Sequence, residues 1–142
     1  MIGVLHTEGD SAEWAFPADP GAVRKARAAV RAQLAGWHLD ELTDVTALLV
    51  SELVTNSLCH ASGPIGVRLV RRTGPRAALL VEVSDPLPDP PRARAAAPDD
   101  EGGRGLQLVA DSSRRWGTRP APRDGRCGAG GKTVWFELAL PG

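Results

Sequence analysis

The chain has 142 residues, with 17 basic and 17 acidic side chains and therefore a formal net charge of zero. This length suits one domain, and 42% hydrophobic with 24% charged residues is typical of a globular protein. Zero net charge disfavours direct binding to nucleic acid or to an anionic membrane, and no run approaches the roughly 18 apolar residues of a membrane helix. The N-terminus lacks the apolar segment of a signal peptide, and Cys59 and Cys127 lack metal-ligand spacing. We therefore expect a cytoplasmic protein with reduced thiols.

The start of the chain predicts a tail, a strand and a helix start. Residues 1–12 are expected to form a flexible tail, and residues 13–142 a single domain. Glu13–Phe16 is an apolar-rich run that ends at a proline, which is typical of an edge strand. Asp19 and Pro20 then resemble a helix N-cap followed by the first helical residue.

Two helices are predicted next. The first has apolar residues three or four positions apart and ends near Gly36. The second begins at Asp40 or Thr43 and runs to about Ala61, where a Ser-Gly-Pro sequence ends it. On a helical wheel its core-facing stripe consists of Leu42, Val45, Leu49 and Leu53.

The hydrophobic period then changes to that of strands. Ile65–Val70 alternates, and Ala77–Val83 is almost entirely apolar, as in a strand covered by helices. A short helix that opens at Gly102 and strands over residues 113–118 and 132–140 complete the chain. We predict a two-layer α+β sandwich, in which helices cover one face of a mixed, mainly antiparallel sheet.

A proline-rich segment interrupts these elements. The stretch from Ser84 to Glu101 has five prolines and no periodicity, so it is either disordered or a functional lid. Asp85 opens this stretch at the end of an apolar strand. It is either the turn-initiating aspartate that is common before proline or a carboxylate placed to accept a hydrogen bond from a ligand amine.

Polar side chains interrupt the apolar stripe of the second helix. Asn56 falls inside the stripe, Glu52 lies at its margin, and His60 is in line with it. Burial of an amide or a carboxylate without partners costs several kcal/mol. Either the amide is satisfied within the core and Glu52 and His60 form an exposed pair, or water, another polar group, or a bound metal and phosphate compensate.

Two glycine-rich stretches suggest phosphate binding. Gly102–Gly105 lies at a helix start, where free N–H groups attract anions and Arg104 would add charge, although many loops have such glycines. Gly130–Thr133 looks like the end of a P-loop. However, Arg126 stands where that motif requires its first glycine, and a strand rather than a helix follows, so this interpretation fails.

The combination of motifs is more specific than any one of them. A helix with ExxxN, an aspartate after a buried strand, a lid, a GxG helix start and a last strand with GKTVW occur in this order. Together they resemble the GHKL ATPase superfamily, which includes gyrase, the MutL-type repair proteins and histidine-kinase catalytic domains. The phrases VSELVTNSLCHA, GGRGLQLVADSSRRWG and GKTVWFEL most resemble those of bacterial anti-sigma-factor serine/threonine kinases and similar stand-alone ATP-binding regulators. The resemblance extends from about Trp14 to Leu140 and implies a Bergerat-type ATP-binding fold.

The resemblance implies a role for each polar residue. Asn56 would coordinate a Mg²⁺ ion that bridges the phosphates of ATP, and Glu52 would be the general base that activates the attacking hydroxyl. Asp85 would accept a hydrogen bond from the adenine amino group, and Thr133 would support this contact through water. The lid, over about residues 85–103, and the helix start would wrap the phosphates through Gly103, Arg104, Gly105 and Leu106.

The resemblance also implies a function. The chain would bind ATP, phosphorylate a serine of an anti-sigma antagonist protein and sequester a sigma factor, without contacting nucleic acid or membrane directly; a homodimer is left open. The family often has glycines soon after the adenine-binding aspartate, but prolines follow Asp85 here. Proline fixes φ and removes donors, so the loop under the adenine must be shaped differently. This departure favours the alternative, a catalytically silent, ATP-gated protein-binding module of the same fold.

Overall fold

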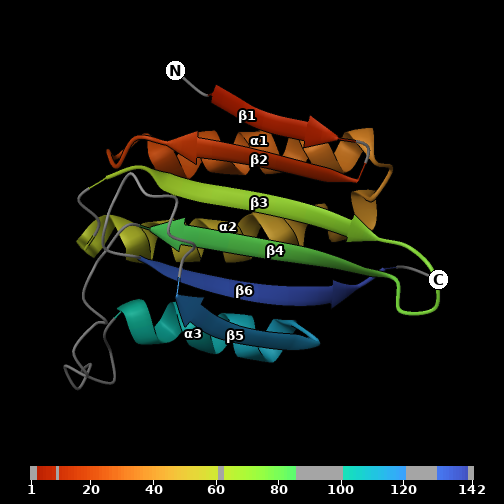
Figure 1. Ribbon diagram of the computed structural model, residues 1–142. Coiled ribbons are helices and arrows are strands. Elements are labelled where there is room, and N and C mark those ends of the chain that lie inside the picture. Colours follow the sequence, from red (N-terminus) through yellow and green to blue (C-terminus); the bar gives the residue numbers. More distant parts are fainter. Residues whose placement is uncertain (1–2, 9, 61–62, 86–100, 121–130, 141–142) are drawn as a thin grey trace.

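The computed structural model describes residues 3–8, 10–60, 63–85, 101–120 and 131–140. These residues form one six-stranded sheet in the order β1-β2-β3-β4-β6-β5, with three helices on one face (Figure 1). The predicted two-layer α+β sandwich is confirmed, and every strand pair in it is antiparallel rather than mixed. The elements are β1 (Gly3–Glu8), β2 (Ser11–Phe16), α1 (Ala22–Gly36), α2 (Asp40–His60), β3 (Ile65–Arg72), β4 (Ala78–Asp85), α3 (Glu101–Ser112), β5 (Arg115–Pro120) and β6 (Lys132–Ala139).

The N-terminal region differs from the prediction of a flexible tail over residues 1–12. β1 pairs with β2, and β2 pairs with β3 along its whole length, so β2 is an interior strand rather than an edge strand. A register shift between Val4 and His6 breaks the two-residue period of β1, which is why alternation does not reveal this strand in the sequence. β2 contributes its buried residues Ala12, Trp14 and Phe16 to the core.

Helix α1 begins later than Asp19 and Pro20 suggest. Gly21 occupies the N-cap, without a capping side chain, and Asp19 lies in the turn before the helix. There the Asp19 Oδ1 atom accepts a hydrogen bond from the Gly21 amide at 2.9 Å. The helix then buries one residue per turn, namely Ala22, Ala26, Val30 and Leu34, as expected for a single apolar face.

Helix α2 lies behind β4 and packs between α1 and α3 (Figure 1). Its buried face includes Leu49 and Leu53 as predicted, but it is centred on Val50 and Val54. The N-terminal part of the predicted stripe, Leu42 and Val45, is only partly buried. The face is displaced because α2 contacts two helices as well as the sheet. Among the described residues, α2 is the one helix long and apolar enough, by length and composition alone, to cross a membrane, and 44% of its apolar window is buried in the fold.

Candidate functional site

Several of the predicted site residues meet at one end of the sheet. Asp85 is the last residue of β4, and Lys132, the first residue of β6, is its direct partner across the two strands. Figure 1 shows that the C-terminal end of α2 and the beginning of α3 lie at this same end, on the left of the view. Four chain segments, the ends of α2 and β4 and the beginnings of α3 and β6, therefore converge there.

The centre of the site is a buried hydrogen bond between α2 and β4. The Ser57 hydroxyl donates to Oδ2 of Asp85 at 3.1 Å, and the two residues are only 8% and 4% exposed. A carboxylate has about four lone-pair positions, so it can accept several hydrogen bonds at once. Ser57 is a site residue that the sequence prediction missed. In the sequence, Ser57 could have been predicted from its position beside Asn56, in the last turns of an otherwise apolar helix.

Other hydroxyl groups of α2 behave differently from Ser57. The Ser51 hydroxyl donates to the carbonyl oxygen of Ala47, and the Thr55 hydroxyl donates to that of Ser51, both at 2.7 Å. Both hydroxyls thus donate within the helix backbone, and the Ser51 hydroxyl also accepts a hydrogen bond from Arg27 Nε of α1 at 3.1 Å. Of these three hydroxyls, that of Ser57 is the one that donates to a strand residue.

Glu52 and Asn56 lie one turn apart on α2, and both are half-buried. The predicted position of Asn56 inside the apolar stripe is wrong, because the buried face is centred elsewhere. Asn56 lies instead at the margin of that face, next in sequence to Ser57. The amide and the carboxylate are therefore half-buried rather than part of the core. The side chain of His60 lies outside the described part of the chain.

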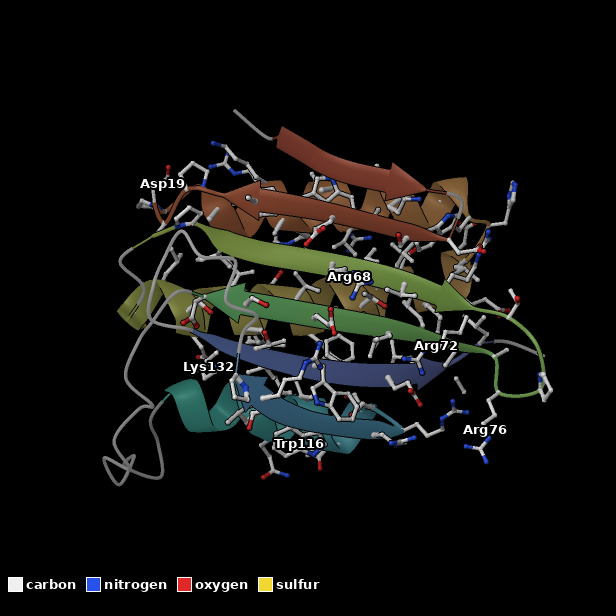
Figure 2. All side chains as sticks on the ribbon, viewed as in Figure 1. Asp19, Arg68, Arg72, Arg76, Trp116 and Lys132 are labelled. Atoms are coloured by element: carbon white, nitrogen blue, oxygen red, sulfur yellow. The ribbon has the colours of Figure 1, made fainter. Side chains whose placement is uncertain are left out.

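Thr133 does not lie on the same face of the sheet as Asp85. Its hydroxyl is 2.7 Å from that of Ser84, its direct partner across β4 and β6. Because neighbouring residues of a strand point to opposite faces, Ser84 and Thr133 point away from the helices while Asp85 points toward them. The role of Thr133 beside Asp85 stays a prediction, and the pairing of Thr133 with Ser84 does not favour it. Lys132, which Figure 2 labels at this end of the sheet, shares the face of Asp85.

Helix α3 provides the glycine-rich helix start. The helix begins at Glu101, so Gly103, Arg104 and Gly105 belong to its first turns, close to the predicted position. Leu106 packs against the core and anchors the helix. The first backbone N–H groups of a helix have no partner within the helix and attract anions. The side chains of residues 101–105, and residues 86–100 of the predicted lid, lie outside the described residues.

The donor set fits an adenine nucleotide with a magnesium ion. Asp85 is a buried acceptor that suits an exocyclic amine, and the amide of Asn56 has the kind of oxygen atom that Mg²⁺ prefers. Within the described ranges, no group of three or more His, Cys, Asp or Glu residues gathers to hold a metal. Mg²⁺ in nucleotide sites usually takes most of its ligands from phosphate and water.

The fold and the site thus define an ATP-binding class of α+β domain, and a comparison with protein families specifies it. Residues 16–134 match the family described as the histidine kinase-like ATPase domain. The match includes Glu52, Asn56, Asp85 and the start of α3, so the chain belongs to this family, in agreement with the GHKL resemblance. A search of curated proteins found no match.

Proposed function

We propose that the chain is a Mg²⁺- and ATP-dependent protein serine/threonine kinase of the anti-sigma-factor type, acting in the cytoplasm. It would phosphorylate a serine of an antagonist protein, and that antagonist would compete with a sigma factor for the kinase. The observation that supports this function best is the placement of Glu52 and Asn56. They lie one turn apart and half-buried on α2, and Asn56 directly precedes Ser57, whose hydroxyl donates to Asp85.

Three groups of the chain would hold the nucleotide. Asp85 would accept a hydrogen bond from the adenine amino group, while Ser57 keeps the carboxylate oriented. The first N–H groups of α3 would bind phosphate oxygens. The Asn56 amide oxygen would be the protein ligand of Mg²⁺, and the ion when bound neutralises phosphate charge.

Glu52 would act on the acceptor rather than on the nucleotide. It is half-buried one turn before Asn56, so its carboxylate lies on the same side of α2. From there it would orient the serine hydroxyl of the antagonist and accept its proton as the serine oxygen bonds to the γ-phosphorus of ATP and the bond from that phosphorus to ADP breaks. Such general-base assistance contributes about 10²–10⁴-fold to rate.

The test is phosphate transfer to a captured partner. The purified chain would be used to capture proteins with and without Mg-ATP, and the captured proteins would be assayed with γ-labelled ATP. We expect Glu52→Gln to bind ATP and partner like the parent but to transfer phosphate about 10²–10⁴-fold more slowly. Glu41→Gln, an exposed change in the first turn of the same helix, is the control and should transfer phosphate at the parental rate.

The alternative function is ATP-gated binding without catalysis. It is favoured by the run after Asp85, where prolines occupy positions 86, 88, 90 and 91 and no glycine occurs. In that case the parent would capture a partner only with Mg-ATP and would label none of it. Equal transfer by the parent and by Glu52→Gln would instead keep the kinase and refute the role of Glu52.

A further inference from the structure

The sheet face opposite the helices carries a cluster of arginines, which we call the arginine face. Figure 2 shows Arg68 and Arg72 in front of the strands, while the helices lie behind them. Within the described part of the chain, no helix covers this face. The arginine face consists of Arg68 and Arg72 of β3, Arg114 beside β5, and Arg115 and Arg119 of β5.

Two buried glutamates lie beneath these arginines. Glu82 of β4 is bridged by Arg68, at 3.0 Å, and by Arg119. Glu137 of β6 is bridged by Arg72 at 3.4 Å and by Arg114 at 3.2 Å. The glutamate side chains are 6–8% exposed, whereas the four arginine side chains are 43–54% exposed. Solvent therefore meets guanidinium groups, and the carboxylates are hidden below them.

A half-buried tryptophan lies among the arginines. Trp135 pairs with Glu82 on one side and with Gly117 on the other, and the Arg115 guanidinium lies 6.0 Å from its ring centroid. A Cβ atom on Gly117 would lie 3.0 Å from the indole ring. The glycine thus allows the ring to lie close against β5, which fixes an aromatic surface at the middle of the face.

We propose that the arginine face docks an acidic segment of a partner protein, whose carboxylates bind the exposed guanidinium groups around Trp135. Arginine and tryptophan are the side chains that most often dominate binding energy at protein interfaces. Guanidinium groups are weakly hydrated and match carboxylates in geometry. Together they favour recognition of an acidic protein surface over an apolar one.

Charge argues against other occupants. Counting Glu13, which is paired with Arg68 across β2 and β3, the described side chains of this face on β2 to β6 and on Arg114 comprise five arginines and three glutamates, an excess of positive charge. A second copy of the chain would bring two such surfaces together, which is unfavourable. Nucleic acid is disfavoured because the whole chain has zero net charge and so lacks the general attraction to a polyanion that supports such binding.

The arrangement of the ion pairs allows a variant that tests docking and preserves the fold. Arg72→Gln with Arg119→Gln removes two charges but leaves each buried glutamate one arginine, Arg114 or Arg68. Arg24→Gln with Arg31→Gln removes two exposed charges from α1, on the other side of the molecule, and is the matched control. The probe is a synthetic glutamate-rich peptide with one phenylalanine, titrated into the nucleotide-free protein while the four indole N–H signals are followed by NMR.

The expected result is a shift of the Trp135 indole signal when the peptide is added. Peptide binding should weaken with added salt. The dissociation constant of the peptide should be about tenfold larger or more for the Arg72 and Arg119 double variant than for the parent. The control should bind like the parent. An unshifted Trp135 signal, or equal weakening in the control, overturns the proposal. It also fails if an oligothymidylate binds this face more tightly than the peptide, or if light scattering shows a dimer that the double variant dissociates. No nucleotide is present, so failure here leaves the proposed kinase untouched.

Discussion

Two carboxylates of β4 have different roles because they lie on opposite faces of the sheet. Asp85 and Glu82 are three residues apart and are 4% and 6% exposed. Glu82 points to the open face and is bridged by two arginines, while Asp85 points to the helices and accepts a hydrogen bond from the neutral Ser57 hydroxyl. A carboxylate between two guanidinium groups stabilises the sheet and leaves positive charge at the surface. A carboxylate oriented by a hydroxyl retains the capacity to recognise a ligand amine.

The largest expected effect in this comparison is on the affinity for ATP at Asp85. Asp85→Asn keeps the shape of the side chain but replaces one acceptor oxygen with a donor, so the adenine amino group loses its charged partner. We expect ATP affinity to fall about 10–100-fold, which is the range for a hydrogen bond to a charged group. Isothermal titration calorimetry measures this directly. Glu82→Gln is the matched control on the same strand, and a loss of affinity there as large as in Asp85→Asn would invalidate the contrast.

The second expected effect is on the stability of the open face. Arg68→Gln combined with Arg119→Gln leaves Glu82 buried without either bridging arginine. The free energy of unfolding should fall by about 2 kcal/mol, less than for a fully buried pair because the arginines are half-exposed. Urea denaturation measures the loss. The single variant Arg119→Gln should cost clearly less, and equal losses in both would show that the two arginines do not share one carboxylate.

The third prediction concerns the packing of Trp135. Gly117→Ala places a methyl group 3.0 Å from the indole ring, so the ring or the strand must shift. We expect a loss of about 1–2 kcal/mol in the free energy of unfolding, as for other overpacking changes. Gly36→Ala, at a glycine with no heavy atom within 4 Å of the added Cβ, should be neutral or slightly stabilising. A neutral Gly117→Ala would show that Trp135 is not held against β5.

The smallest effect tests which face the ligand occupies. Thr133→Val removes the hydroxyl that pairs with Ser84, so the free energy of unfolding should fall by about 1 kcal/mol. ATP affinity should change less than about twofold, because this hydroxyl lies on the face away from Asp85. Thermal unfolding and calorimetry on the same sample separate the two quantities. A large loss of ATP affinity would restore the water-mediated role that the family resemblance assigns to Thr133.

The sequence predicts much of the fold because most elements have clear hydrophobic periods. Helix α1 and strands β3, β4 and β6 lie within a few residues of their predicted limits. β1 escapes prediction because the register shift between Val4 and His6 disrupts its alternation. The buried face of α2 also differs from the stripe predicted on the helical wheel. The periodicity of one helix does not reveal that two other helices pack against it.

The candidate site is predicted less completely than the fold. The positions of Glu52, Asn56 and Asp85 follow from polar residues in apolar surroundings together with the resemblance. Ser57 and Lys132 are missed because both depend on tertiary contacts: α2 must lie against β4, and β6 must pair in one particular register. A shift of this register by one residue would exchange the faces of Lys132 and Thr133, so a motif alone does not decide between them.

The central claim is that ATP binds on the helix side of the sheet at the Ser57–Asp85 end, and an NMR titration tests it most directly. Backbone amide signals of the isotope-labelled chain would be followed while Mg-ATP is added. The account predicts large shifts at Asn56, Ser57, Asp85 and Lys132, and little change at Arg68, Arg72 and Glu137 on the open face. Shifts concentrated on the open face, with those around Asp85 unchanged, would contradict it.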